Sequence, residues 1–291
     1  MNFGAVEKIA DAVLYEGYLL YPYRQSAVKN QQRFNFGVLY PKTYSELQTG
    51  ADAWEMQTEC LVSGESSATV DVKVRFLQMV NRQDRQEGVE REVYLSGCSL
   101  SAPLRHTFVF DALQGELEFS AAKIDEQLFR ITLAVRNCVE FEDAGREQAL
   151  LNSFVSVHSL LHVSGGEFIS LLDPPEQFKA AVSECKNVGT WPVLAGEEGQ
   201  RDLMLSAPII LYDYPQIAPE SPGDLFDGTE IDEILALRIL TMTDSEKLEV
   251  RNGDDRARKI LERTEMLPPE HFQKLHGALR GLRSRQPEKS L

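Results

Sequence analysis

The chain has 291 residues, of which 43% are hydrophobic and 26% charged, the ordinary composition of a globular protein with one large or two medium cores. Its 45 acidic and 30 basic residues give a net charge of −15, which disfavours binding to nucleic acid or anionic lipid, because both are bound chiefly through Lys and Arg. The longest apolar runs fall far short of the roughly 20 residues that span a bilayer, and no basic stretch followed by an apolar one marks the N-terminus. We therefore expect a cytoplasmic protein without membrane insertion.

Residues 1–143 are expected to form a β-rich domain. The clearest signal lies between Phe129 and Phe141, where apolar residues alternate with polar or small ones, as on a strand that buries one face. The same alternation recurs over residues 70–76. Several antiparallel strands separated by turn signals favour a β-sandwich-like arrangement.

Two shorter strands are expected over residues 104–110 and 115–119, joined by a Gly-containing turn. The stretch from Asn81 to Gly88 is polar and charged, so we expect an exposed connection there rather than a strand. Both features fit a sheet built from consecutive antiparallel strands.

Beyond residue 143 the spacing of apolar residues along the sequence changes. Apolar residues between Leu151 and His162 recur at three-to-four spacing, which predicts an amphipathic helix, and Gly165-Gly166 follows as its terminator. This change marks the start of a smaller α/β region, residues 144–227.

The rest of that region is expected to mix short strands and one helix. Strands are expected over residues 167–172 and 208–212, and Asp173 followed by two prolines predicts an N-cap and first turn for a helix to about Cys185. A proline-rich connection over residues 214–223 follows, which cannot form a regular ladder because its prolines lack amide donors.

Residues 228–291 are expected to be a helical segment. Thr229 is a candidate N-cap, Thr243 and Glu246 form a capping box, and Pro268-Pro269 opens a last helix with one apolar face. The chain as a whole is therefore predicted to be an α+β protein: a mostly antiparallel β-sandwich-like part, then the α/β region, then the helical segment.

The interval from residue 202 to 237 contains eight acidic residues and no Lys or Arg. Four of these carboxylates lie on or beside the proline-rich connection and could bind a hard divalent cation, which prefers oxygen ligands: Asp213, Glu220, Asp224 and Asp227. Their spacing fits no EF-hand loop. The alternatives are carboxylates that form turns and favour a helix N-terminus, or a face that docks another protein.

His158 and His162 are one turn apart on the expected helix, a spacing that lets two imidazoles share a metal. The glutamate of the HExxH pattern is absent, and both histidines fall on or beside the apolar stripe. Packed, hydrogen-bonded histidines are therefore favoured over metal ligands.

No complete catalytic or cofactor signature occurs in the sequence. Four cysteines lie far apart without a CxxC pair, so neither a zinc ribbon nor an iron–sulfur cluster is indicated, and buried reduced thiols are favoured. There is no GxSxG elbow, no GxxxxGKS or GxxxxGKT phosphate loop, and no GxGxxG after a strand. We assign no catalytic residue and no cofactor.

The stretch from Tyr15 to Tyr44 holds six tyrosines, two phenylalanines and four basic residues, a composition typical of contact surfaces. Aromatic residues packed on a sheet beneath basic side chains would give the same composition. We take candidate partner-binding residues from this stretch and from the acidic interval: Tyr21, Tyr23, Arg24, Arg33, Tyr212, Asp213, Tyr214, Glu220, Asp224 and Asp227.

Five strings together resemble a bacterial protein family of unknown function associated with nickel–iron (NiFe) hydrogenase gene clusters. They are LYEGYLLYPYR (14–24), NFGVLYP (35–41), GEFISLLDPP (166–175), NVGTWPV (187–193) and PIILYDYPQIAPESPGDLFDGTEIDEI (208–234). The resemblance covers nearly the whole chain but carries no catalytic residues. It implies a non-enzymatic accessory protein that assists maturation or assembly of the hydrogenase by docking a hydrogenase subunit or a maturation factor.

Two other functions remain open at this point. The first is a divalent-metal-dependent enzyme that uses the acidic interval, with His158 and His162 as further candidate ligands. The second is a β-sandwich that binds a small ligand in a concave apolar pocket. The hydrogenase itself is excluded, because its large subunit needs paired CxxC thiolates that this chain lacks.

Overall fold

The computed structural model describes residues 3–19, 36–48, 52–82, 85–142 and 145–216, with the isolated residues Lys247, Arg251 and Glu262. The chain divides into two compact units, Met1–Ile217 and Ala218–Leu291. Nearly all described residues belong to the first unit. The C-terminal helical segment therefore stays a prediction, although the three isolated residues are helical.

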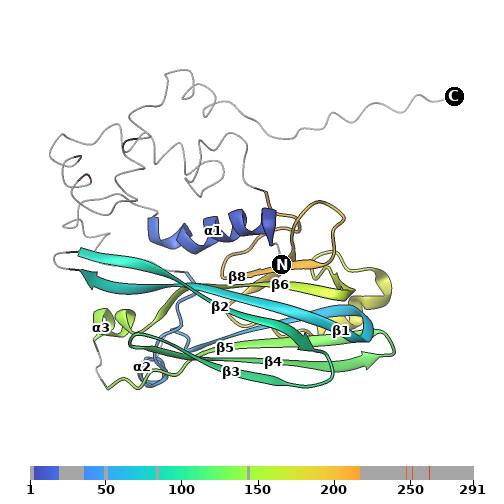
Figure 1. Cartoon of the computed structure of the whole chain (residues 1–291), viewed down its shortest axis with the longest axis horizontal. Helices are drawn as coiled ribbons and strands as arrows, with labels where there is room; N and C mark the ends of the chain where they lie inside the picture. The colour runs from blue at the N-terminus through green and yellow to red at the C-terminus, as the bar shows by residue number, and fades with distance from the viewer. Residues whose placement is uncertain are drawn as a thin grey trace. The chain divides into compact units, whose positions relative to one another are not determined.

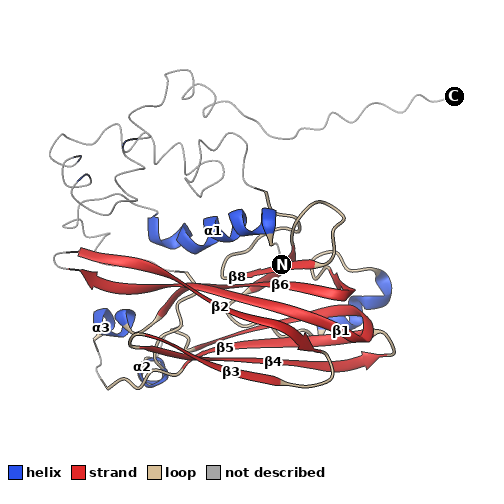
Figure 2. Ribbon diagram, viewed as in Figure 1, coloured by secondary structure: helices blue, strands red, loops and turns tan. Residues whose placement is uncertain are grey.

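The first unit is built on one eight-stranded sheet in the order β3-β4-β5-β1-β6-β8-β7, with β2 also paired to β1 (Figures 1 and 2). Neighbouring strands pair antiparallel throughout the described part of the sheet. The strands are β1 (Glu55–Arg82), β2 (Arg85–Ser99), β3 (Leu104–Phe110), β4 (Leu113–Asp125), β5 (Leu128–Asn137), β6 (Phe154–Ile169), β7 (Trp191–Leu194) and β8 (Leu203–Ala207). The prediction of a β-rich, mostly antiparallel protein is confirmed.

Strand β1 belongs to both halves of the sheet. Along one edge, residues 55–63 pair with β5 and residues 69–82 pair with β2, while β6 pairs along the opposite edge of both parts. The halves fold toward each other, and one apolar core containing Val74, Phe119 and Leu161 lies between them. This arrangement resembles a sandwich made from one continuous sheet.

The sheet bends where β1 changes its partner from β5 to β2. Pairing with β6 is interrupted between Gly64 and Thr69. A Cβ atom on Gly64 would lie 2.8 Å from the carbonyl oxygen of Gly165 and 2.9 Å from Cα of Gly166. Only glycine allows the two backbones to approach this closely, so Gly64 permits the bend.

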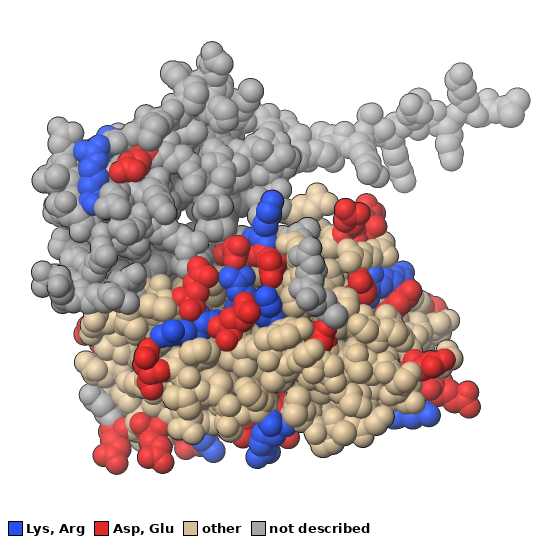
Figure 3. Space-filling model, viewed as in Figure 1, with Lys and Arg blue, Asp and Glu red and all other residues tan. Residues whose placement is uncertain are grey.

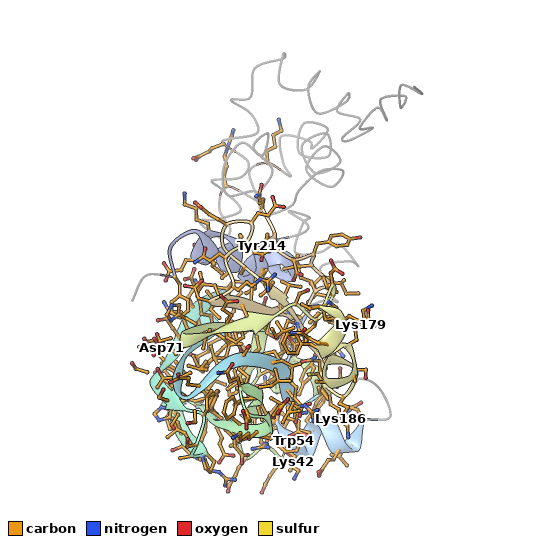
Figure 4. All side chains as sticks on the ribbon, turned by 90° about the vertical axis from the view of Figure 1, so that its right-hand side faces the viewer. Lys42, Trp54, Asp71, Lys179, Lys186 and Tyr214 are labelled. Carbon is orange, nitrogen blue, oxygen red and sulfur yellow. The ribbon has the colours of Figure 1, made fainter. Side chains whose placement is uncertain are left out.

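Short helices flank the sheet: α1 (Gly4–Leu19), α2 (Lys42–Leu47), α3 (Arg146–Leu151), the 3-10 turn η1 (Glu176–Phe178) and α4 (Lys179–Ser183). Helix α1 packs on β6 and β8 through a small apolar cluster that includes Val6 and Leu160 (Figure 1). At α2, the Nζ of Lys42 lies 4.6 Å from the centroid of the Trp54 ring (Figure 4). None of the described helices is both long and apolar enough to cross a membrane.

The amphipathic helix predicted from Leu151 to His162 is wrong, because most of this stretch belongs to strand β6. Residues 153–161 are all buried, with the main core on one face and α1 with β8 on the other. A strand buried on both faces has no period-two alternation, so its apolar residues can match helical spacing by chance.

Other boundaries also differ. The strand predicted over 208–212 lies earlier, as β8, and 208–212 is irregular. Residues 81–82 and 85–88 continue a β1–β2 hairpin instead of forming a loop. The β3–β4 turn contains Asp111 at φ 51° rather than a glycine.

The helix predicted up to Cys185 is present in shorter form as η1 and α4, but Pro175 rather than Asp173 occupies the N-cap. Strand β6 ends at Ile169, so the strand expected over 167–172 is only partly present. β5 and β6 lie on either side of residue 143 in sequence, and both pair with β1 in one sheet.

Candidate functional site

The acidic residue Asp213 has a structural role. Its carboxylate accepts a hydrogen bond from Ser170 Oγ at 2.5 Å and another from the backbone N–H of Leu194 at 2.8 Å. Because each oxygen has a protein donor, Asp213 ties the end of β7 to the turn after β6. This use of both oxygens disfavours the predicted role of Asp213 as a metal ligand or partner contact.

Tyr214 also stabilises the fold. Its N–H donates to the carbonyl of Leu194 at 2.7 Å, and its side chain packs against the main core. Its φ of 56° places it in the left-handed region, which a tyrosine adopts only when surrounding contacts hold it there. Together with Asp213, Tyr214 anchors the chain after it leaves β8.

The segment 208–214 therefore runs between two fixed points, the end of β8 and the anchor at Leu194. Ile209 and Leu211 pack against the apolar cluster beneath α1. Ile210 and Tyr212 are 75% and 86% exposed. The alternation shows that the segment buries one side and presents an isoleucine and a tyrosine to solvent on the other.

Trp191 adds a third exposed apolar side chain. It is the first residue of β7, pairs with Ala207 directly before the segment, and is 44% exposed. Of the predicted partner-binding residues that the structure describes, only Tyr212 is thus held in an exposed position. Sequence reasoning missed Trp191 and Ile210. For Ile210 a signal was present: residues 209 to 212 are all apolar or aromatic, and an extended segment that buries one side can bury only every second one of them.

A cluster of charges lies between α1 and the sheet, and Figure 3 shows acidic and basic side chains gathered around α1. Lys73 Nζ lies 2.9 Å from Glu7 and 3.4 Å from Glu92. Arg75 contacts Asp11 at 2.6 Å, and Glu90 and Glu92 at 3.5 and 4.0 Å. Burial lowers the pKa of Lys73, but its hydrogen bond to Glu7 and the charge of Glu92 more than compensate and raise it.

His158 is fully buried beside this cluster. Its Nδ1 lies 2.9 Å from the carbonyl of Ser156, and its Nε2 has no hydrogen-bond partner. Burial lowers the pKa of His158 to about 3, assisted by the neighbouring charge of Arg75, so the imidazole is neutral at ordinary pH. The prediction of a packed histidine is confirmed for His158, although only one of its nitrogens is hydrogen-bonded.

His162 lies between two carboxylates. Its Nδ1 is 3.8 Å from Asp71 and its Nε2 is 3.6 Å from Asp202, both beyond hydrogen-bonding distance. His158 and His162 are four residues apart on a strand, about 13 Å at the usual rise, so they cannot share one metal ion. The two carboxylates also face opposite nitrogens, which prevents them from joining His162 around a single ion.

A second arginine cluster lies on the outer face of the other half of the sheet. Arg136 contacts Glu118 at 2.5 Å, Glu116 at 3.0 Å and Glu55 at 3.1 Å. Hydrogen bonding to Arg136 lowers the pKa of Glu118. Hydrogen bonding to Glu118 raises the pKa of Arg136, which remains a permanent cation.

The described cysteines show no activated thiol. Burial raises the pKa of Cys98 to about 11 and also raises that of Cys60, Cys138 and Cys185. Cys60 lies in the main core, whereas Cys185 packs on a separate apolar cluster with Leu61. Within the described ranges, no group of three or more His, Cys, Asp or Glu side chains could hold a metal ion.

The remaining predicted site residues lie outside the described part of the chain, so their roles stay predictions. These are Tyr21, Tyr23, Arg24, Arg33, Glu220, Asp224 and Asp227. Neither the protein-family models nor the curated proteins compared with this chain give a match. Any functional conclusion therefore depends on the residues themselves and on the resemblance described above.

Proposed function

We propose that this protein is a non-enzymatic accessory factor that docks a protein partner through the 208–214 segment. The observation that carries the proposal is the exposure of Ile210 and Tyr212 on a segment whose other side is fixed by Asp213, Tyr214 and the cluster under α1. Anchors held in place before binding lose little conformational entropy on association.

The chemistry of these side chains suits a protein partner. Tyrosine and tryptophan are enriched among the residues that contribute most to protein interfaces, and Tyr212 and Trp191 are both exposed. The net charge of −15 favours a partner with a basic rim around an apolar groove, because opposite charges steer association.

The resemblance to a family associated with NiFe-hydrogenase gene clusters supplies the proposed context. The partner would then be a hydrogenase subunit or a maturation factor, and the location would be the cytoplasm. The identity of the partner is inferred from the sequence strings alone, whereas a docking role is inferred also from the exposed Ile210 and Tyr212.

The test is affinity capture of tagged full-length protein from a host that produces NiFe hydrogenase, with co-purifying proteins identified and metal content measured. We expect a hydrogenase subunit or maturation factor to co-purify with the wild type. The double variant Ile210→Ala/Tyr212→Ala should reduce recovery about tenfold or more. Tyr94→Ala is the matched control, since it removes an exposed tyrosine from β2.

Two results would contradict the proposal. Equal recovery with the double variant and the wild type would show that the segment is not the docking surface. Absence of any hydrogenase-related protein, together with about one divalent metal per chain, would favour the metalloenzyme alternative instead. Thermal unfolding of each variant checks that a loss of binding is not a loss of folding.

A further inference from the structure

The described strands leave three edges of the sheet, formed by β2, β3 and β7. An unprotected edge presents backbone donors and acceptors that pair readily with another strand, so proteins usually cover edges or place charges on them. The three edges differ in how they are protected.

Two edges carry visible protection. On β7, the outward backbone groups of Leu194 are already bonded to Asp213 and Tyr214. On β2, three consecutive charged residues, Glu90, Arg91 and Glu92, occupy the middle of the strand. Both features oppose the addition of a further strand.

Strand β3 lacks both forms of protection. Its sequence from Leu104 to Phe110 contains one charged residue, Arg105, and its only strand partner among the described residues is β4. Five of its seven residues are exposed, including Val109 at 65%. An exposed edge of this length with a single charged residue is suited to pairing with a second strand.

The sequence of β3 is complementary to itself. In an antiparallel pair that aligns all seven residues, Thr107 faces Thr107 of the second copy, a favourable cross-strand combination. Arg105 faces Val109, and His106 faces Phe108, so no arginine lies opposite an arginine. Side chains that face each other across two strands lie on the same side of the sheet. This register meets that requirement, because it pairs even-numbered residues with even-numbered ones and odd-numbered residues with odd-numbered ones.

We propose that β3 is a self-association surface, on which β3 of a second copy adds in antiparallel register about Thr107 to form a two-fold dimer. Such an interface is isologous, with the same patch on both subunits. It uses other residues than the 208–214 segment, so separate variants can test each surface. Since each chain carries a charge of −15, repulsion between copies weakens the dimer, and added salt should strengthen it.

The experiment is sedimentation of the full chain over a range of concentrations. We expect wild-type protein to show a monomer–dimer equilibrium whose Kd falls as salt is raised. Thr107→Lys and Thr107→Glu each place like charges opposite one another across the dimer, and each should raise the Kd at least about tenfold. Because Thr107 also pairs with Glu116 of its own β4, urea denaturation of the Thr107→Glu variant checks that its fold is kept. An equimolar mixture of the two variants places Lys opposite Glu and should restore the dimer as a heterodimer.

Gln114→Lys is the control, because Gln114 is exposed on the same face but lies one strand inside the edge. It should change the Kd less than about twofold. Wild-type protein that stays monomeric at every concentration would overturn the proposal. So would Thr107 variants that dimerise as well as wild type, or variants that fail to recover on mixing while still folded by circular dichroism.

Discussion

Two arginines, one on each half of the folded sheet, are each surrounded by three carboxylates, but only one of them is covered by a helix. Arg136 contacts Glu55, Glu116 and Glu118, all on strands adjacent to its own. Arg75 contacts Glu90 and Glu92 on β2 and, at its shortest distance of 2.6 Å, Asp11 on α1. The side chains are 24% and 10% exposed respectively.

The difference shows how one chemical arrangement serves two purposes. Around Arg136 the ion pairs connect strands that backbone hydrogen bonds already hold together, so they add little specificity. Around Arg75 the ion pair to Asp11, together with that of Lys73 to Glu7, fixes a helix that otherwise contacts the sheet mainly through a small apolar cluster. Arg75 is also the more deeply buried of the two arginines, so its charge is less screened by water than that of Arg136.

The largest expected effect is that of Arg75→Ala. It removes a side chain that is only 10% exposed, together with its ion pairs to Asp11 and Glu90, while Lys73 stays 3.4 Å from Glu92. We expect a loss of about 3 kcal/mol in the free energy of unfolding, from lost packing as well as lost charge. Urea denaturation of the full chain measures this change. A loss below about 1 kcal/mol would show that α1 is held without Arg75, by the Lys73–Glu7 ion pair and the apolar contacts.

The next effect concerns His158, which has no counterpart near Arg136. Its folded-state pKa of about 3 lies below the ordinary value of about 6.5. Between these two values His158 is protonated in the unfolded chain but neutral in the native state. Stability should therefore fall as the pH decreases through this window, by about 2 kcal/mol between pH 6.5 and 5.

The matched variant is His158→Leu, which removes both the titration and the unpartnered Nε2. We expect its unfolding free energy to vary less with pH than that of wild type over the same window, as measured by urea denaturation at several pH values. Identical slopes for the two proteins would mean that His158 is accessible to protons in the native state.

The smallest effect should come from Arg136→Ala. Its ion pairs join strands that backbone hydrogen bonds already hold together, and the Arg136 side chain is 24% exposed against 10% for Arg75, so we expect a loss of about 1 kcal/mol. Differential scanning calorimetry of both arginine variants compares them directly. Equal losses from Arg75→Ala and Arg136→Ala would remove the distinction between the covered and the open cluster.

Some of the fold could be predicted from sequence because burial on one face leaves a regular pattern. The alternation around Ile131 and Val74 identified β5 and part of β1, and the exposed Asn81 region was misread only because a polar hairpin resembles a loop. Strand β6 was misread because both of its faces are covered, so nothing in its own residues distinguishes it from a buried helix.

The candidate site was less predictable than the fold. Tyr212 was selected for its residue type and proves exposed, but its neighbours Asp213 and Tyr214, selected for the same reason, stabilise the fold. A carboxylate or phenol does not reveal from sequence whether it will face solvent or a backbone amide. That depends on Ser170 and Leu194, which are distant in the chain.

The sequence alone determined the acidic character of the protein, the β-rich class and the absence of a recognisable catalytic motif, because these depend on composition and local period. Only the tertiary structure decided which charges pair, which histidine loses its proton affinity, and which side of the 208–214 segment faces solvent. Those properties arise from contacts between residues as far apart as Asp11 and Arg75 or Ser170 and Asp213, which no local pattern encodes.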